Sequence, residues 1–271
     1  MNSYQPKALL NDLQYYITPP HDCSYLPNKS ARMVFLDPAH RIDVVTLSEL
    51  SRTGFRRSGD FVYRPECHLC RQCLSSRVPV IEFRMNSSQK KAWKRNQDLV
   101  MKITTPEQAG DLHYALYERY INERHADGDM FPPTRDQFEK FLLQSCTDSF
   151  FLELWQDQRL ISVSTCDLLD DGISAVYTFF DPNENRRSLG AFAILKQIEH
   201  AQKLGLKFVY LGYWVPHSAK MNYKSQYLPL ELLIDGQWRR LNHALSAAEI
   251  QHLGHSLMTT LPSGWNHQII K

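Results

Sequence analysis

Three short segments of strand-forming residues, separated by two tight turns, constrain the fold of this chain more than any other feature of its sequence. The segments cover residues 150–155, 160–168 and 173–180 and are rich in aromatic and β-branched side chains. Residues 156–159 and the triplet Asp170-Asp171-Gly172 separate them, and connections this short join antiparallel neighbours. The sequence therefore predicts a three-stranded antiparallel meander in the second half of the chain.

A helix and one more strand follow this meander. The predicted helix, residues 188–204, carries small and aliphatic side chains along one face, and Gly205 stands where a helix C-cap belongs. Residues 207–211 are apolar enough for a buried strand, and a helix is the usual crossover to a parallel neighbour. Two earlier helices are expected at residues 111–125 and 134–146, the second with a capping box at its start.

The order of these elements indicates a fold class. An antiparallel meander, a crossover helix and a parallel strand follow one another in the GCN5-related N-acetyltransferase-like (GNAT) fold, whose fourth and fifth strands splay to form a cleft. We therefore expect an α+β protein with a GNAT-like catalytic domain at residues 101–271. Residues 1–100 would form a smaller N-terminal domain that contains a cysteine cluster, and the polar, basic stretch 86–97 is the best candidate for the boundary.

Charge and hydropathy limit the functions open to the chain. Its 31 Lys and Arg residues nearly balance 29 Asp and Glu residues, so a nucleic acid would have to be bound by local basic patches. The N-terminus lacks the pattern of a secretory signal, and the sequence has no apolar run of the roughly 18 residues that a membrane span requires. We therefore expect a cytoplasmic protein, with its six cysteines reduced.

Several multi-residue motifs resemble the arginyl/leucyl-tRNA–protein transferases, in the order in which that family carries them. The resemblance extends from about Cys23 to about Leu233. It rests on these blocks: Cys23-Ser24-Tyr25-Leu26-Pro27, Gly54-Phe55-Arg56-Arg57-Ser58-Gly59, Tyr63-Arg64-Pro65-Glu66-Cys67, Arg77-Val78, Tyr177-Thr178-Phe179-Phe180-Asp181-Pro182, Arg187-Ser188-Leu189-Gly190, Leu211-Gly212-Tyr213-Trp214 and Met221-Asn222-Tyr223-Lys224. Such an ordered set is far more specific than one short pattern.

One difference between this sequence and the family's motifs distinguishes two branches of the family. The eukaryotic arginyltransferases are much longer and carry Cys-Gly-Tyr-Cys where this chain has Cys23-Ser24-Tyr25-Leu26, so the bacterial leucyl branch is the more similar. That resemblance implies transfer of leucine from Leu-tRNA to proteins that begin with Asp or Glu, which marks them for degradation by the N-degron route. An arginyl donor and a coenzyme A-dependent GNAT acetyltransferase remain the alternatives, with a zinc-type RNA-binding module as a non-catalytic one.

The implied reaction needs no cofactor for its driving force. An aminoacyl-tRNA is an activated ester, and the enzyme must align it with an amine and stabilise the oxyanion of the tetrahedral intermediate. A protein α-amine has a pKa of about 7.7–8.0, so only modest general-base help is required. Asp181, at the end of the third predicted strand, is the candidate base, with Tyr177 on the same side by strand alternation. Asp181 could equally be a strand terminator and helix cap.

Arginines and polar aromatic residues supply candidate substrate contacts. Arg56 and Arg57 lie between two turn glycines and Arg64 follows shortly after, and their guanidinium groups could recognise the acidic first residue of the acceptor. Five further residues are predicted to bind the tRNA end through phosphate contacts and base stacking: Arg187, Tyr213, Lys220, Tyr223 and Lys224. Arg187 precedes a helix start that partly matches a pyrophosphate-binding loop, although Phe192 stands where coenzyme A binding favours Gly or Ala.

Four cysteines have the spacing of metal ligands. Cys67, Cys70 and Cys73 are separated by two residues each, and Cys23 lies upstream. Eukaryotic relatives are thought to bind an iron–sulfur cluster through cysteines of this region, but the pairing of the cysteines differs here. Zinc, an iron–sulfur cluster, a purely structural thiol group and a redox switch all remain open at this point.

Overall fold

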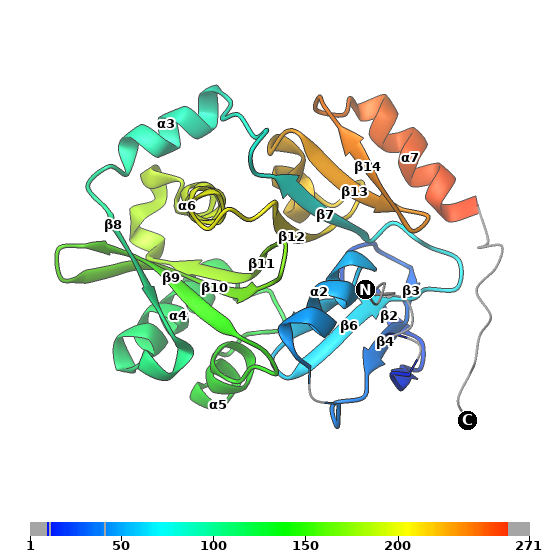
Figure 1. Cartoon of the computed structure of the whole chain (residues 1–271), viewed down its shortest axis with the longest axis horizontal. Coiled ribbons are helices and arrows are strands. Elements are labelled where there is room, and N and C mark those ends of the chain that lie inside the picture. The colour runs from blue at the N-terminus through cyan, green and yellow to red at the C-terminus, as the bar shows by residue number, and fades with distance from the viewer. Residues whose placement is uncertain (1–9, 11, 41, 260–271) are drawn as a thin grey trace, which may run out of the picture.

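A large mixed sheet forms the centre of the computed structural model, which describes residues 10, 12–40 and 42–259 (Figure 1). The sheet has eight strands in the order β14-β13-β7-β12-β11-β10-β9-β8. In chain order they are β7 (Leu74–Pro79), β8 (Val100–Thr104), β9 (Ser149–Gln156), β10 (Arg159–Leu168), β11 (Gly172–Phe180), β12 (Phe208–Trp214), β13 (Leu230–Ile234) and β14 (Gln237–Leu241).

The predicted meander and crossover are present in this sheet. β9, β10 and β11 pair antiparallel, α6 (Leu189–Lys203) follows them, and β12 then pairs with β11 in parallel. The apolar face of α6 is buried against the sheet, and Gly205 after it has a φ of 70°, which suits glycine at the end of a helix. The predicted strand at 207–211 was too short, since β12 continues to Trp214.

Helices cover both faces of the large sheet. On one face lie α3 (Ser87–Arg95), α6 and α7 (Ala247–Thr259), and on the other α4 (Asp111–Arg124) and α5 (Arg135–Phe138), which continues as a π-helical turn, η2 (Glu139–Leu143) (Figure 1). The helix predicted at 111–125 is confirmed. The one predicted at 134–146 begins as expected, with the Thr134 hydroxyl accepting from the Gln137 amide at 3.1 Å, but ends at Leu143. No helix within the described residues is long and apolar enough to cross a lipid bilayer.

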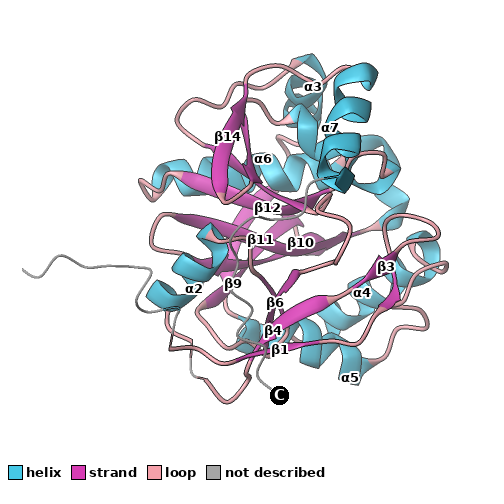
Figure 2. Ribbon diagram, turned by 90° about the vertical axis from the view of Figure 1, so that its right-hand side faces the viewer, coloured by secondary structure: helices cyan, strands magenta, loops and turns pink. Residues whose placement is uncertain are grey.

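A smaller sheet comes from the first part of the chain. Its order is β1-β4-β6-β5, and in Figure 2 β1, β4 and β6 lie below the strands of the large sheet. Its strands are β1 (Tyr15–Ile17), β4 (Met33–Leu36), β5 (Arg56–Ser58) and β6 (Phe61–Pro65). The strands β2 (His21–Asp22) and β3 (Ser30–Ala31) form a separate pair, and α2 (Val44–Arg52) follows β4. Leu47 and Leu50 of α2 pack with Phe55 and with Tyr210 of β12, so one core joins the two sheets.

Part of the chain before residue 100 also belongs to the large sheet. β7 lies inside the large sheet between β12 and β13, and α3 packs on α6. The stretch 86–97, predicted as the domain boundary, contains α3, which begins with a capping box between Asn86 and Gln89. The ring of Trp93 on this helix packs 5.6 Å from that of Phe192, so the helix is anchored by a buried aromatic contact.

Candidate active site between two separating strands

β11 and β12 pair over only three residues and then separate. The parallel ladder joins residues 172–174 to 208–210, although β11 continues to Phe180 and β12 to Trp214. Beyond the ladder each strand is irregular: the register slips at Val176 in β11 and at Leu211 in β12. Because an extra residue bends a strand, two such irregularities side by side account for the separation.

Arg56 of β5 lies where the two strands part. Its guanidinium group donates to the carbonyl of Tyr210 on β12, at 3.4 Å, and to the carbonyl of Ala175 on β11. A Cβ atom at Gly212, where φ is 80°, would stand 3.4 Å from this guanidinium group. Arg56 therefore satisfies carbonyl oxygens that would otherwise lack a ladder partner after the strands separate.

The separating strands border a cleft of about 700 Å³. Tyrosines from distant parts of the chain dominate its wall: Tyr25, Tyr63, Tyr120, Tyr177, Tyr213, Tyr223 and Tyr227. Gly190, Ala191, Ile194 and Gln197 of α6 form another part, and they share one face of that helix. The cleft therefore combines flat aromatic surfaces with a helix face whose small residues let a ligand approach closely.

Positive charge exceeds negative charge in this cleft. Arg56, Arg57, Lys220 and Lys224 line it, and Asp129 is the one carboxylate among its described lining residues. Burial and the neighbouring Arg56 lower the pKa of Lys224 to about 7. A ligand that carries a carboxylate or phosphate group would gain Coulomb energy on entering.

The three arginines predicted to bind the acceptor lie in different surroundings. Arg56 is at the floor of the cleft, while Arg57 forms a buried ion pair with Asp167 of β10, with nitrogen–oxygen distances of 2.8 and 2.9 Å. Arg64 pairs with Glu66 at 3.0 Å, lies over the ring of Phe55, and is not among the residues that line the cleft. Of the three, Arg56 has the position that best suits contact with a substrate.

The two predicted catalytic residues do not lie together. Tyr177 lines the cleft and packs 5.2 Å from Phe141, and burial raises its pKa. Asp181 is buried outside the lining, where it accepts from the Asn183 amide at 3.1 Å and caps the 3-10 segment η3 (Pro182–Arg187). Asp181 also pairs with two arginines, Arg119 at 3.4 Å and Arg159 at 3.3 Å. Asp181 is still in extended conformation as the N-cap of η3, but its carboxylate is occupied by the cap and the two arginines and does not reach the cleft.

Four of the five predicted tRNA contacts line the cleft. They are Tyr213, Lys220, Tyr223 and Lys224, the last three from the 3-10 segment η4 (Ala219–Gln226). Arg187 lies elsewhere: it pairs with Asp98 and Glu184, each at 2.8 Å, so its charge is already balanced. Phe192 does not obstruct the start of α6, because its ring is 2% exposed and packs inward against Trp93.

The thiols of Cys23, Cys67, Cys70 and Cys73 lie near one another, but their arrangement does not fit a metal ion. No three His, Cys, Asp or Glu side chains in the described part of the chain could hold a metal together. Burial, reinforced by the neighbouring thiols, raises the pKa of Cys67 and Cys73. Cys67 donates weakly to the carbonyl of Arg32 at 3.9 Å.

One residue of the cleft was missed in the sequence. Gln197 is fully buried, and neither atom of its amide has a hydrogen-bond partner within the described part of the chain. The sequence does carry a signal for it: Gln197 interrupts the apolar stripe of α6 between Ile194 and Ala201. A buried amide without a partner is costly and rare, so its position on the cleft wall suggests a ligand contact.

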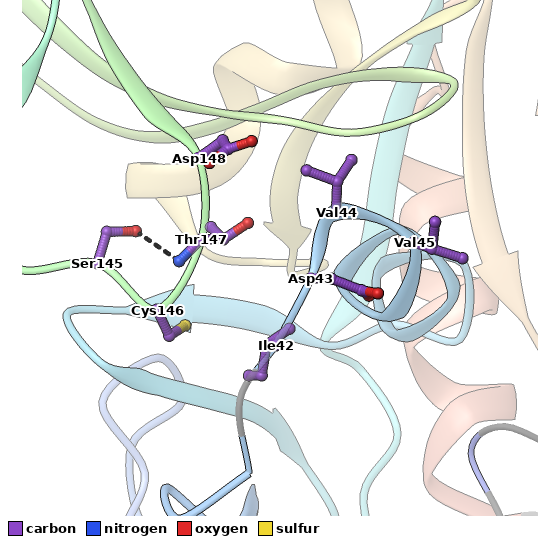
Figure 3. A pocket seen from close by; sticks show the side chains of 8 residues that line it. All are labelled: Ile42, Asp43, Val44, Val45, Ser145, Cys146, Thr147 and Asp148. Carbon is purple, nitrogen blue, oxygen red and sulfur yellow. Dashed lines mark hydrogen bonds between the residues drawn. The ribbon is translucent and has the colours of Figure 1, made fainter.

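A second depression, of about 550 Å³, lies between the start of α2 and residues 145–148 (Figure 3). Its polar groups serve local structure: Asp43 caps α2 by accepting from the Thr46 amide at 2.7 Å, and Ser145 accepts from the Thr147 amide at 3.3 Å. No set of charged groups converges there among the described lining residues, so the cleft beside Arg56 is the candidate active site.

Comparison with known proteins agrees with the order of the sequence motifs. A family model described as the N terminus of arginine-tRNA-protein transferase matches residues 21–91, and its C-terminal counterpart matches residues 112–234. An aspartate/glutamate leucyltransferase from Acinetobacter baumannii (strain ATCC 17978) is 80% identical over the full length of both chains. One from Pseudomonas fluorescens (strain Pf0-1) is 52% identical over 85% of this chain and 97% of its own.

A solved structure, that of L-PGS from Bacillus licheniformis, is similar over 70% of this chain and 66% of its own, at 9% identity. Its TM-score of 0.43 indicates only a weak similarity between the two structures. Full-length identity of 80% and two consecutive family models are decisive by themselves. The chain belongs to the arginine-tRNA-protein transferase family.

Proposed function

We propose that this chain transfers leucine from Leu-tRNA to the N-terminal amine of proteins that begin with Asp or Glu, and that the cleft beside Arg56 is where the two substrates meet. Membership of the family makes the chain an aminoacyltransferase. The name shared by its relatives of 80% and 52% identity supports leucine as the donor and Asp or Glu as the acceptor residue.

The order of the elements supports a GNAT-like arrangement for the catalytic part. β9, β10 and β11 form an antiparallel meander, α6 crosses over, and β12 pairs in parallel before it separates from β11. Both α6 and β5 contribute residues to the cleft that opens where these two strands separate. α6 would then face the aminoacyl end of the tRNA, and β5 with Arg56 would face the acceptor.

The observation that carries the acceptor assignment is the buried charge of Arg56. Its hydrogen bonds to Tyr210 and Ala175 go to backbone carbonyl oxygens, not to a carboxylate. Arg57 beside it is already neutralised by Asp167. A carboxylate side chain that entered the cleft would therefore meet a cation that is already desolvated, and a charge-assisted hydrogen bond there is stronger than one in water.

The tRNA end would use the aromatic and basic residues of η4. Tyr223 is 48% exposed and Lys220 is exposed at the cleft, which suits a stacked terminal base and a nearby phosphate. Lys220 has one weak competing partner, Asp127, at 3.7 Å across the surface. These contacts would place the leucyl ester beside the amine and leave the reaction driven by the ester itself.

Two other donors are less well supported by the geometry. Coenzyme A would need an anion site at the start of α6, but Arg187 there is neutralised by Asp98 and Glu184. An arginyl donor would need a carboxylate for its side chain, and Asp129 is the single one in the described lining of the cleft. A leucyl side chain needs no such partner, so the aromatic and apolar part of the cleft wall suits it better than a guanidinium group, whose burial without a carboxylate costs several kcal/mol.

A transfer assay tests the proposal directly. Purified protein is offered labelled Leu-tRNA, labelled Arg-tRNA or labelled acetyl-coenzyme A with peptides that begin with Asp, Glu, Arg or Ala. Labelling of the Asp and Glu peptides from Leu-tRNA alone is expected. Efficient labelling from Arg-tRNA, or labelling that is indifferent to the first residue of the peptide, would overturn the donor or the acceptor assignment respectively.

A further inference from the structure

Lys224 has surroundings that are unusual for a lysine. It lies in η4, beside the separated end of β12, and is 5% exposed. Its amine donates to the backbone carbonyl of Tyr213 and lies 5.8 Å from the ring of Tyr223. Within the described residues no ion pair of Lys224 with a carboxylate is formed. A buried ammonium group without an anion is strongly disfavoured.

The groups that face Lys224 do not supply the missing negative charge. Arg56 of β5 is the charged one, and its proximity disfavours a second cation. Tyr63 of β6, Tyr213 of β12 and Tyr120 of α4 surround the same part of the cleft, together with Tyr223 of η4. Burial raises the pKa of Tyr63, Tyr120 and Tyr213, so they remain neutral phenols. The lysine is therefore a neutral amine in a substantial fraction of molecules near neutral pH.

We propose that Lys224 carries the proton in aminoacyl transfer: as a neutral amine it takes the proton that the acceptor's α-amine loses, and it returns that proton to the leaving ribose oxygen. The inference rests on the proposed function. The α-amine nitrogen forms a bond to the ester carbonyl carbon, and collapse of the tetrahedral intermediate breaks the bond from that carbon to the ribose oxygen. The proton gained by the lysine amine ends on the ribose hydroxyl, so the group is neutral again after each turnover.

The position of Lys224 fits this role better than the phosphate contact expected from sequence. A lysine that binds phosphate works as a fixed cation and is usually exposed, as Lys220 is. Lys224 is instead buried within the cleft, where a proton carrier must lie to reach both the attacking nitrogen and the leaving oxygen. Its hydrogen bond to the Tyr213 carbonyl fixes the amine beside β12. The lone pair of the neutral amine stays available for a proton from the substrate.

The test compares the parent with three variants of the full chain under single turnover, with Leu-tRNA and an Asp-starting peptide. Lys224→Arg keeps the charge and the hydrogen bond but cannot give up its proton at these pH values, and Lys224→Met removes both. Lys203→Met, on an exposed side chain at the far end of α6, is the matched control. Rates are measured from about pH 6 to about pH 9, the range in which the acceptor amine also titrates.

Both Lys224 variants are expected to lose about 100-fold or more in the rate of transfer, with Leu-tRNA affinity within a few-fold of the parent. The parent rate should fall below about pH 7, where Lys224 is protonated, and that step should be missing from the variants, leaving only the titration of the peptide amine. Small primary amines should restore part of the rate to Lys224→Met. Thermal unfolding separates this loss of rate from misfolding. A Lys224→Arg variant that folds normally should keep the melting temperature of the parent.

Two outcomes would overturn the assignment of Lys224. If Lys224→Arg transferred leucine at close to the parent rate, the lysine would act as a fixed cation. If both variants reached the parent rate at saturating tRNA but bound tRNA more weakly, Lys224 would be a phosphate contact. A parent enzyme that transferred no leucine to the peptide would instead refute the proposed function, and this result is distinguishable because it does not depend on the variants.

Discussion

Arg56 donates hydrogen bonds to both β11 and β12, and we propose that its charge also binds the acidic side chain of the acceptor. Arg56→Gln removes the charge and, because its side chain is shorter, also loses at least one of the bonds to the carbonyls of Tyr210 and Ala175. We expect kcat/KM for an Asp-starting peptide to fall by about 10- to 150-fold, which corresponds to about 1.5–3 kcal/mol. The affinity for Leu-tRNA should change little. Steady-state kinetics with varied peptide, beside Arg64→Ala as a comparison outside the cleft, would check this.

The reverse pattern would contradict this assignment of Arg56. If Arg64→Ala weakened acceptor use while Arg56→Gln left it intact, the acidic side chain would bind outside the cleft. If Arg56→Gln weakened tRNA binding at an unchanged peptide KM, Arg56 would face a phosphate group. The separation between Arg56 in the cleft and Arg64 over Phe55 makes these results independent of each other.

Gln197 offers a test in which stability and activity should move in opposite directions. Its amide is buried without a partner among the described residues, so the apolar replacement Gln197→Met should raise the free energy of unfolding by about 1–3 kcal/mol. If the amide binds substrate, the same variant should bind Leu-tRNA or peptide more weakly. Urea unfolding and binding measurements would check both. A loss of stability would show that the amide already has a partner in the free protein.

At the scale of the element, the approach of β11 to β12 depends on Gly172. A Cβ atom there would lie 2.5 Å from the carbonyl oxygen of Phe208, far closer than packing allows. Gly172→Ala should therefore push the strands apart at their short ladder and lower the free energy of unfolding by about 1–3 kcal/mol. Gly110→Ala is the control, because a Cβ atom at Gly110 would have no described heavy atom beyond its chain neighbours within 4 Å. Equal stability of the two variants in urea would contradict the close approach.

The ion pair of Arg57 and Asp167 joins the small sheet to the large one. Both side chains are at most 1% exposed, and Ser149 also donates to the carboxylate at 2.6 Å. Because removal of one partner leaves a buried charge, Arg57→Met should cost about 3–5 kcal/mol of stability. The double variant Arg57→Met with Asp167→Leu should recover part of that loss. If Arg57→Met were as stable as the parent but impaired in acceptor use, the predicted acceptor role of Arg57 would stand.

At the scale of the whole molecule, β7 makes the two halves of the chain interdependent. It pairs with β12 over residues 208–214 and with β13, so both strands lose their neighbour when β7 is removed. A fragment of residues 101–271 should therefore fail to unfold cooperatively in urea, while the full chain does so. Addition of a separately prepared fragment of residues 1–100 should restore cooperative unfolding. A cooperative 101–271 fragment would show that the catalytic part folds alone.

Local patterns determined a large part of the fold. The meander, α4, α6 and the parallel strand β12 were all predicted, because each depends on side-chain periodicity and turn chemistry within one segment. The family also followed from the sequence, since its motifs are contiguous blocks of residues. The helix at 86–97 was not predicted, because polarity alone does not distinguish a linker from an exposed amphipathic helix such as α3.

Tertiary structure decided which of the candidate residues share a cleft. Arg56, Arg57 and Arg64 are nearly adjacent in sequence, yet Arg56 reaches Tyr210, Arg57 reaches Asp167 and Arg64 lies over Phe55. These partners are remote in the chain, and their choice depends on which charges can be desolvated together when the two sheets pack. The irregularities in β11 and β12, the insertion of β7 and the burial of Lys224 likewise arise from long-range pairing, which no local pattern specifies.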